Sequence, residues 1–468
     1  MSLRFSGPEY LSDGTFSTAT YEYSGSDDRS WSVARNSSLY LDAGPGYRLL
    51  TSEVCGICST DLARQYLPFP LPQIIGHEIV ARDENGQRYV VEINASHRAR
   101  GLASECLYCN NDLHTHCPER LVLGINTLPG GFGPRILAPV NAAIAIPDDL
   151  DSELAVLVEP LAAALHAVRS LGLNAGDRVA VLGPRRLGML VVAALTAHRR
   201  LTGSDYAVIA LARRDEILTM ARRFGADETY NVTSSPEALV GIADVVIDTT
   251  GNPEGLDLAL QIAKREVHLK STHGRTAAGL RTLTATVVDE ISIARFPASS
   301  DALRGMSLIP NSSPRVAWLA QEEPPSWLEL AYRGSSAKSA FDEASAATNP
   351  AARFDVVVVD SASAVDEVVR PSKECEIALV RPRGEILIAP GVSDSESSLL
   401  NAVAKGNLRV STTRCGEFEP ALQLLNDQEL RSALREVITH RFSVSEISSA
   451  FEVARSAACM KAVVWQTQ

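Results

Sequence analysis

The sequence has no excess of positive charge. Its 468 residues include 44 Lys and Arg against 56 Asp and Glu, which gives a net charge of −12 at pH 7. Nucleic acids and anionic membranes bind basic patches, and the chain has no block rich in Lys and Arg, so both partners are disfavoured. The hydrophobic fraction of 45% and the charged fraction of 21% indicate a folded globular protein of about two to four domains.

Long apolar runs are also missing. The longest, LGMLVVAAL at 187–195, is well short of the ~20 residues that a membrane-spanning helix requires. The first residues, MSLRFSGPEYLSDGTFS, contain no apolar core of the type found in secretory signals. We therefore expect a cytoplasmic protein with no membrane partner.

Cysteine is sparse in the second half of the chain. Cys375, Cys415 and Cys459 are scattered there, and isolated cysteines are typically small buried hydrophobic residues. In a reducing compartment, clustered cysteines bind metal or take part in chemistry more often than they form disulfides. The remaining cysteines all lie early in the chain: Cys55, Cys58, Cys106, Cys109 and Cys117.

The first third of the chain has a sequence pattern typical of β proteins. Residues 1–46 are rich in Ser, Asp, Gly and Tyr with little periodicity, and we predict a leading arm with one hairpin. From Tyr47 to about residue 160, short apolar runs such as YRLLTSEVCG and RYVVEINA alternate with Gly, Pro and Asn. This alternation predicts a small β-barrel or sandwich that ends in a helix.

The pattern changes over residues 161–303. Apolar strand-like runs, DRVAVLG (177–183), AVIALA (207–212) and ADVVIDTTG (243–251), alternate with the helix-like stretches LGMLVVAALTAHRR and EILTMARRFGA. Strands that alternate with helices predict βαβ units and a parallel, doubly wound sheet. The overall fold class is therefore α/β, with a β-rich domain first and a nucleotide-type domain second.

Residues 304–422 are more chain than one such domain needs, and they contain a faint repeat. ADVVIDTTG resembles FDVVVVDSA, with Asp244 opposite Asp355 and Glu266 opposite Glu385. Residues 287–303 likewise resemble 403–422. Two interpretations remain open: a true duplication, or the general likeness of strand–helix units. We predict loop and short helices over 304–353, and a return to the core, through a helix and a final strand, over 423–468.

Three short motifs carry ligands that zinc prefers. They are GICSTD (56–61), GHE (76–78) and VEPLAAALHA (158–167). Catalytic zinc is held by thiolate, imidazole and carboxylate groups, with one position left open. Cys58, His77 and a carboxylate from Glu78 or Glu159 would supply such a set.

In these residues the chain resembles the medium-chain, zinc-dependent alcohol dehydrogenase superfamily, which includes sorbitol and threonine dehydrogenases. The resemblance runs from about Tyr47 to Ala302 and resumes near Leu408. It implies a GroES-like zinc-binding catalytic domain over 47–160 and a Rossmann cofactor domain over 161–303. It also implies that Cys58, His77, Glu78 and Glu159 serve the catalytic zinc.

The resemblance further implies roles in catalysis for Thr60 and Glu78. Thr60 matches the hydroxyl that passes the substrate proton towards solvent, and Glu78 shares the acidic role at the metal. The next relay position is a histidine in some members of the family and is Ala63 here. The sequence therefore does not identify the residue that takes this proton onward from Thr60.

Family members often carry a second, structural zinc on four cysteines. ECLYCNNDLHTHC supplies Cys106, Cys109 and Cys117, while Ala103 stands at the position of the first ligand. His97 would take that place if RARGLAS is a local insertion, and it would complete a three-cysteine, one-histidine site. The alternative is that the zinc is lost and three thiols remain. His114 and His116 are two further candidate ligands, and we expect both to be surface residues.

The dinucleotide fingerprint is incomplete. After DRVAVL the loop reads Gly183-Pro184-Arg185-Arg186-Leu187-Gly188, so Arg185 stands where the second glycine normally allows the pyrophosphate to approach. Either this guanidinium pairs with a phosphate, which its geometry suits, or the loop binds no dinucleotide in the usual pose.

The end of the second predicted strand favours NADP(H) over NAD(H). NAD-binding members carry an acid there, and this chain has Ala212 followed by Arg213 and Arg214. Arginine at this place can hold a 2′-phosphate. The alternative is that both arginines are solvated residues at the start of a helix.

Two functions follow. The first is a zinc-dependent oxidoreductase that exchanges a hydride between a nicotinamide cofactor and a small alcohol or carbonyl substrate. The second is a degenerate member that keeps zinc without hydride transfer and acts as a metal-dependent lyase, a hydrolase or a scaffold. Arg185 and Ala63 motivate the second function, and the complete set of catalytic zinc ligands argues against a pure scaffold.

The extra segment bears on the oligomeric state, which is monomer or dimer. In the resembled family, the Rossmann sheet ends in an edge strand that pairs with the same strand of a second subunit, and ISIARF (291–296) matches that strand. We expect residues 304–410 to pack against the cofactor domain and to block this pairing. No second fingerprint loop precedes FDVVVVD, so we expect no second cofactor there.

Overall fold

The chain folds into two compact units. The computed structural model describes residues 1–234, 236–271, 274–345, 349–372, 377–392 and 397–466. The first unit contains residues 1–165 and 415–468, and the second contains residues 166–414. None of the helices in the described residues has the length and apolarity that a membrane crossing requires.

The N-terminal segment is a four-stranded antiparallel sheet in the order β1-β2-β3-β4. The sequence suggested an arm with one hairpin, but the buried Ala19, Tyr21 and Tyr23 alternate with partly buried residues and belong to the core. This period of two buries one face of the sheet. Its strands are β1 (Ser2–Tyr10), β2 (Phe16–Gly25), β3 (Trp31–Arg35) and β4 (Ser38–Gly44).

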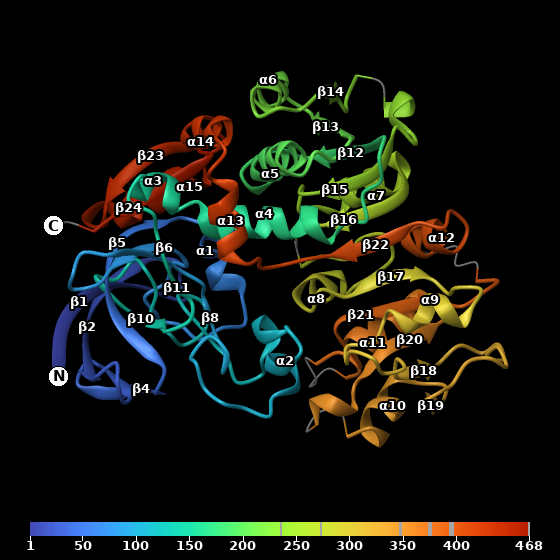
Figure 1. Cartoon of the computed structure of the whole chain (residues 1–468), viewed down its shortest axis with the longest axis horizontal. Coiled ribbons are helices and arrows are strands. Elements are labelled where there is room, and N and C mark those ends of the chain that lie inside the picture. The colour runs from blue at the N-terminus through green and yellow to red at the C-terminus, as the bar shows by residue number, and fades with distance from the viewer. Residues whose placement is uncertain (235, 272–273, 346–348, 373–376, 393–396, 467–468) are drawn as a thin grey trace. The chain divides into compact units, whose positions relative to one another are not determined.

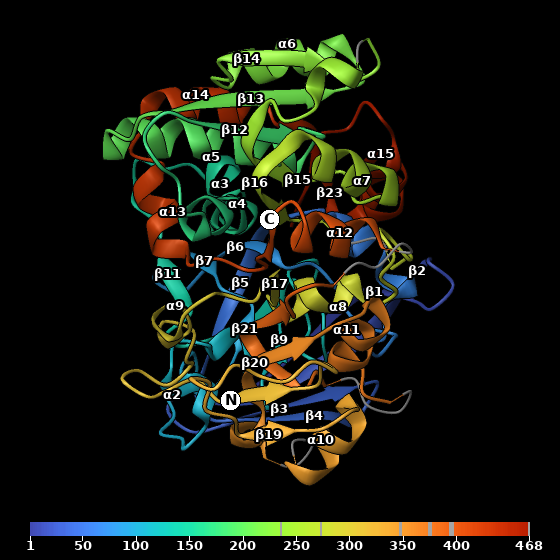
Figure 2. The same ribbon diagram turned by 90° about the vertical axis from the view of Figure 1, so that its right-hand side faces the viewer.

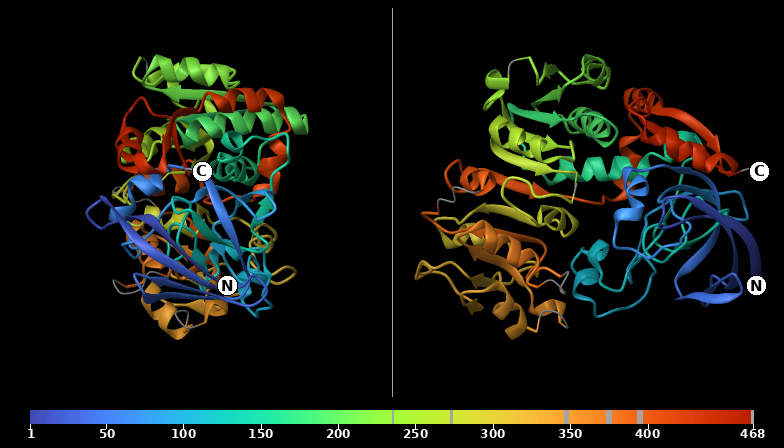
Figure 3. Two further views of the ribbon diagram at one scale, coloured as in Figure 1. Left: turned by 90° about the vertical axis from the view of Figure 1, so that its left-hand side faces the viewer. Right: turned by 180° about the vertical axis from the view of Figure 1, so that it is seen from behind.

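A second sheet of the first unit has the order β11-β7-β6-β5-β24-β23, with β10 also paired to β5. The end of the chain enters it, because β24 runs antiparallel to β5 and places Val464 opposite Cys55. Figure 3 shows these last elements, in red, beside the early blue strands. The strands are β5 (Tyr47–Gly56), β6 (Glu78–Arg82), β7 (Arg88–Val91), β10 (Arg135–Pro139), β11 (Ala143–Ala145), β23 (Ile438–Ser443) and β24 (Lys461–Trp465).

Helices and short strands complete the first unit. Phe451 of α15 joins the core under the N-terminal sheet, where its ring lies 4.8 Å from the ring of Phe16. Helix α4 continues across the boundary between the units. The remaining elements are α1 (Ser59–Leu62), β8 (Asn94–Ala95), α2 (Leu107–Asn110), β9 (Leu121–Val122), α3 (Ser152–Ala155), α4 (Val158–Ser170), α13 (Phe418–Leu424), α14 (Gln428–Arg435) and α15 (Ile447–Arg455).

The second unit is built on one long sheet. Within the described residues its strands follow the order β14-β13-β12-β15-β16-β22-β17-β21-β20-β18-β19, from top to bottom in Figure 1. The strands are β12 (Asp177–Leu182), β13 (Tyr206–Ala212), β14 (Glu228–Asn231), β15 (Ala243–Asp248), β16 (Ala263–Leu269), β17 (Ser292–Arg295), β18 (Val316–Trp318), β19 (Tyr332–Arg333), β20 (Phe354–Val359), β21 (Val380–Ile388) and β22 (Arg409–Thr412).

Helices cover this sheet, and several of its strands are buried over most of their length. Every residue of β20 is buried, as parallel sheets with covered faces require. The segment 304–353, for which loop and short helices were expected, also contains β18 and β19, which are too short to be recognised as apolar runs. The helices are α5 (Leu187–Thr202), α6 (Asp215–Arg223), α7 (Pro253–Ile262), α8 (Leu283–Val288), α9 (Ser300–Arg304), α10 (Ala337–Glu343), α11 (Ala362–Val369) and α12 (Ser398–Ala404).

The long sheet consists of two halves with matching strand orders. Counted along the chain, the first five strands of the first half have the order 3-2-1-4-5, and β22 takes the sixth place of a Rossmann arrangement. The second half, read from its own outer edge, has the order 2-1-4-5-6. Each half is parallel, and the two meet where β17 and β22 pair antiparallel. Figure 2 shows β17, β21 and β20 side by side in the second half.

The same side chain ties the first and fourth strands together in both halves. Asp244 accepts the backbone N–H of Arg178 at 2.8 Å, and Asp355 accepts that of Arg315 at 2.7 Å. Each aspartate begins a fourth strand, and each N–H belongs to the start of a first strand. The two aspartates are the pair that the sequence repeat placed opposite each other.

The fifth strands also share one register. Val245 lies opposite Glu266 in the first half, and Val356 lies opposite Glu385 in the second. The paired strands of the two halves therefore match in register, although the chain between the fourth and fifth strands is longer in the second half.

The sixth strands are exchanged between the halves. β17 follows the first half in the chain but pairs with β21, while β22 follows the second half but pairs with β16. Ile293 and Val410 occupy corresponding positions and pair with each other. An antiparallel pair of corresponding residues is the contact found on the two-fold axis of a symmetric dimer, formed here inside one chain.

We predict that the protein is a monomer of 50.2 kDa in solution. The edge of the first half is covered by β17 of the same chain, so its N–H and C=O groups are not available to a second subunit. Light scattering coupled to size exclusion measures this mass directly. A mass of twice that value at micromolar concentration would contradict the prediction.

Candidate metal centres and cofactor loop

Cys58 and His77 lie together in the first unit beside a buried carboxylate. The backbone N–H of Cys58 donates to Asp61 Oδ2 at 2.8 Å, and Asp61 Oδ1 lies 3.2 Å from His77 Nδ1. Asp61 and His77 are 1% and 3% exposed. A carboxylate against Nδ1 orients the ring and leaves Nε2 for a metal ion, a recurrent arrangement at zinc sites.

The electrostatics of His77 reflect these neighbours. Burial lowers the pKa of His77, but the Asp61 carboxylate and the Cys58 side chain raise it, and the net pKa lies well above its ordinary value. These neighbours therefore favour positive charge on the ring of His77. Thr60 adds a hydroxyl whose oxygen lies 3.8 Å from Cys58 Sγ.

Glu78 is engaged in a buried ion pair. Its two oxygens lie 2.5 and 2.7 Å from Lys461 Nζ, and both residues are buried. Burial lowers the pKa of Lys461, but Glu78 and Cys58 raise it, with a net increase that keeps the ammonium charged. The Glu78 carboxylate also explains why residue 56 is a glycine, because a Cβ at that position would lie 2.0 Å from Glu78 Oε2.

Glu159 stands in the first turn of α4 and is half-buried. It adds to the negative potential at Lys461, as do Glu78 and Cys58, so the expected acidic groups surround one buried cation. Lys461 holds both oxygens of Glu78, so a metal ion would compete with this ion pair for that carboxylate.

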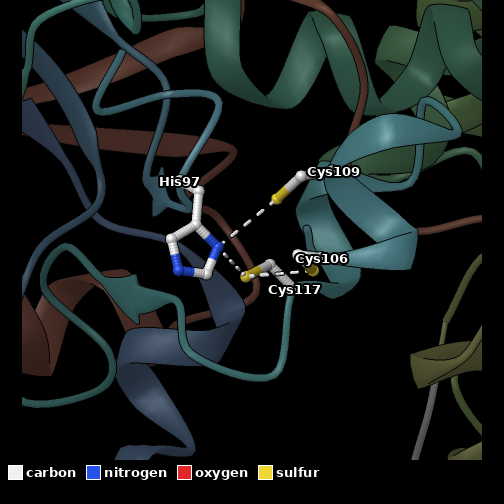
Figure 4. Close-up of side chains that lie close together, drawn as sticks. All are labelled: His97, Cys106, Cys109 and Cys117. Carbon is white, nitrogen blue, oxygen red and sulfur yellow. Dashed lines mark hydrogen bonds between the residues drawn. The ribbon is translucent and has the colours of Figure 1, made fainter. Parts of the chain in front are cut away.

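A second cluster is the tightest ligand set in the described part of the chain. Its four ligand atoms all lie within 4.8 Å of one another (Figure 4). His97 Nδ1 lies 3.4 Å from Cys117 Sγ and 3.8 Å from Cys109 Sγ. Three sulfurs and one imidazole are the donor set of a closed zinc site. Its members are His97, Cys106, Cys109 and Cys117.

The surroundings of this cluster suit a metal ion. His97 Nε2 lies 3.3 Å from Glu119 Oε2, so the other ring nitrogen is directed at the sulfurs. Burial and the neighbouring thiols raise the pKa of Cys117 to about 12, although nearby backbone N–H groups lower it. A metal ion would relieve this cost because it binds the thiolate form. His114 and His116 lie outside the set, and His114 contacts Glu92.

The glycine loop of the second unit keeps its outer glycines for steric reasons. A Cβ on Gly183, whose φ is +79°, would lie 2.9 Å from Thr250 Cγ2. A Cβ on Gly188 would lie 2.4 Å from Thr249 Oγ1. The first and third fingerprint positions therefore serve the tight turn and the close packing of helix on strand, as in dinucleotide sites.

Arg185 at the second position is part of a tight turn. Its N–H donates to Gly183 O at 2.7 Å, and its carbonyl accepts from Gly188 at 2.7 Å. The backbone strain falls on the next residue, Arg186, with a φ of +42°. A non-glycine residue in this region is uncommon and is found where the surrounding structure imposes it.

Arg213 and Arg214 follow β13 and are both exposed. The carbonyl of Arg213 accepts a hydrogen bond from Asn231, which fixes the backbone while the guanidinium faces solvent. This position is compatible with a 2′-phosphate ligand and equally with solvation at a helix start.

Sequence reasoning missed several polar residues. Asp61 lies within GICSTD and could have been found from its spacing, because a carboxylate three residues after Cys58 forms a capping box. Lys461 is distant from Glu78 in the chain, and no local pattern marks it. Two further residues were also missed: the buried His268, whose ring contacts Ser411 and Thr413 at 2.8 Å, and Lys270 beside it.

Comparison with known proteins agrees with this arrangement. Residues 44–148 match the family described as the alcohol dehydrogenase GroES-like domain. An L-threonine 3-dehydrogenase of Mesorhizobium japonicum is 27% identical over 236 residues, which cover 47% of this chain and 64% of that protein. One from Pectobacterium carotovorum is 30% identical over 203 residues, which cover 42% and 54%. The chain thus spans less than two thirds of the length of these relatives.

Solved structures share the fold across almost the entire chain. A protein described as a zinc-binding dehydrogenase from Sinorhizobium meliloti, bound to NADP, has a TM-score of 0.55 at 19% identity and covers 99% of each chain. The 2R,3R-butanediol dehydrogenase of Bacillus subtilis has a TM-score of 0.54 at 17% identity, covering 99% of this chain and 100% of its own. In its GroES-like domain, its Rossmann sheet and these relatives, the chain is similar to the medium-chain zinc-dependent alcohol dehydrogenase superfamily.

Proposed function

We propose that the protein is a zinc-dependent oxidoreductase that exchanges a hydride between a nicotinamide cofactor and a small alcohol or carbonyl substrate. The observation that carries this proposal is the buried His77, held between Asp61 and Cys58 in the first unit. An oriented imidazole beside a thiol, with a carboxylate behind it, suits a catalytic zinc. The relatives named as dehydrogenases support the same reaction class.

Cys58, His77 and Glu159 would hold the catalytic zinc. Glu78 would lie next to these ligands without binding the zinc itself, since Lys461 engages both of its oxygens. When bound, the metal supplies a Lewis acid for the substrate oxygen. The buried Lys461 in turn balances the negative charge that the carboxylates and the Cys58 thiolate bring to this part of the unit.

Thr60 would move the proton in this reaction. Its Oγ1 lies beside Cys58 Sγ and would accept the proton of the substrate hydroxyl during oxidation. Ala63 has no group that takes a proton further, so the proton would leave by another route, such as solvent.

We further propose a structural zinc on the second cluster. Its three thiols and the imidazole of His97 lie close enough to surround one ion, and Glu119 orients the imidazole. Such a site lends stability to the loop that carries it, because metal binding is coupled to folding.

The cofactor we propose is NADP(H) rather than NAD(H). Arg213 is exposed at the end of β13, and Ala212 stands where an acid would bind the ribose hydroxyl of NAD. Arg185 would pair with a phosphate, since guanidinium matches phosphate geometry. A cytoplasmic location is consistent with the reduced state that these cysteine clusters require.

Cys58→Ser should remove the catalytic zinc and reduce turnover by at least about a hundredfold, because the thiolate is a direct ligand of the metal that activates the substrate. Metal analysis and turnover of the purified variant measure both effects. Cys415→Ser is the matched control and should retain both. Unchanged zinc content in Cys58→Ser would contradict the assignment.

His97→Ala should lose the structural zinc and lower the melting temperature, because a closed site needs four ligands. His97→Cys should keep the zinc, since it supplies a fourth thiolate. Zinc per chain and thermal unfolding of the three proteins provide the comparison. Equal metal content in wild type and His97→Ala would show that His97 is no ligand.

Arg213→Ala should weaken NADPH binding by about tenfold or more and leave NADH binding little changed, because only NADPH carries the 2′-phosphate. Fluorescence titration measures both affinities. Arg222→Ala, an exposed arginine of α6, controls for the loss of one charge. An equal loss for both cofactors would rule out this role. No binding of either cofactor to the wild-type protein would favour the alternative, a member with zinc but without hydride transfer.

A further inference from the structure

The second half of the long sheet contains a cavity of about 430 Å³. This volume is in the range of small-molecule binding sites. The cavity lies outside the carboxyl ends of three strands, since Leu319 follows β18, Gly334 follows β19 and Asp360 follows β20. Its polar lining is formed by Gln321, Arg333, Ser335, Asp360, Ser361, Ser363 and Glu367.

The place of this cavity in the sheet is that of a ligand site. β18 pairs with β19 on one side and with β20 on the other. The chain therefore runs outward from β18 to β19, and in the opposite direction from β20 to β21. In open parallel sheets, ligands bind in the crevice at such a switch point. The matching registers of the two halves put this crevice at the position that the glycine loop occupies after β12 in the first half.

The chemistry of the lining differs from that of the first half. The chain leaves β18 through Gln321-Glu322-Glu323, with no glycine loop, and the described residues between β18 and β19 form no helix. The guanidinium of Arg333 is 2.6 Å from Glu323, so its charge is already balanced. Asp360 and Glu367 add negative charge, which repels a phosphate group.

The same lining is suited to hydroxyl groups. Asp360 Oδ2 accepts the backbone N–H of Gln321 at 2.9 Å, which orients the carboxylate at the end of β20. Serine hydroxyls lie around it, with Ser361 and Ser363 3.3 Å apart. In dinucleotide sites a carboxylate at the end of the second strand accepts the O–H groups of ribose. Asp360 offers the same kind of acceptor at the end of β20, the fourth strand of this half.

We propose that this cavity binds an uncharged molecule with a vicinal diol, and that Asp360 accepts the hydrogens of the diol. The ribose of a nucleoside and a free pentose share this chemistry. Small apolar residues, Ala337 and Ala364, line the cavity beside the serines and leave room for such a ligand. The site is separate from the metal centres and does not depend on dehydrogenase activity.

Calorimetric titration of the full-length protein with adenosine and with D-ribose tests this proposal. Adenosine should bind, and 2′,3′-dideoxyadenosine, which lacks the diol, should bind at least about tenfold more weakly. AMP should also bind more weakly than adenosine because of its phosphate. Titration with D-ribose distinguishes a nucleoside from a free pentose as the ligand. If D-ribose binds, the diol is sufficient; if only adenosine binds, the base contributes to binding.

Asp360→Ala should weaken adenosine binding by about tenfold or more, while Asp342→Ala, an exposed acid of α10 outside the cavity, should not change it. Asp360→Asn keeps an oxygen for Gln321 and removes the charge, so it should weaken binding without loss of fold, as checked by thermal unfolding. The proposal is overturned if neither diol binds, if AMP binds more tightly than adenosine, or if the folded Asp360 variants bind adenosine as the wild type does.

Discussion

The long sheet of the second unit depends on the backbone pairing of Ile293 with Val410. Two parallel half-sheets run in opposite directions at this point, and each contributes its last strand to the other. Neither half has a complete edge without the other, because β22 reaches the first half only after the whole second half has been traversed. The exchange covers two edges that would otherwise present unpaired N–H and C=O groups. The extra chain is therefore an integral part of the sheet.

This construction resembles a symmetric dimer made within one chain. In a true dimer the two halves are identical, whereas here they are free to diverge. The first half keeps its glycines at 183 and 188, which close packing against Thr249 and Thr250 imposes. The second half has replaced the corresponding loop with acidic residues and has kept the crevice. We infer that one half retains the phosphate chemistry and the other binds through hydroxyl recognition.

The metal chemistry that we propose for the first unit would depend on charged groups behind the proposed ligands. Asp61 sets the orientation of His77, and Lys461 engages Glu78. A buried ion pair of this type contributes little net stability, but removal of one partner leaves an uncompensated buried charge that costs several kcal/mol, about 3–5 in measured cases. Lys461 is the first residue of β24, and this strand pairs with β5 because the end of the chain returns to the first unit.

Local sequence determined much of this protein. The apolar runs and their breakers predicted the β-rich and Rossmann parts, and the motifs around Cys58 and His77 indicated the resemblance to zinc-dependent dehydrogenases. The likeness around Asp244 and Asp355 raised the possibility of a repeat. These features are encoded within a few residues, so one sequence suffices to find them. The sequence did not predict all four N-terminal strands, because their many Ser and Tyr residues obscure the alternation of polar and apolar residues on which strand prediction depends.

Tertiary structure decided the rest. The exchange of β17 and β22 could not be predicted, because both strands have the same apolar pattern and only long-range pairing assigns them to a half. The same holds for Lys461, whose partner Glu78 lies at the other end of the chain. For the second metal cluster, the sequence offered His97 as a fourth ligand or loss of the zinc, and only the folded loop shows the imidazole beside Cys109 and Cys117. In each case the deciding interaction joins residues distant in sequence, and local patterns contain no information on which distant partners will meet.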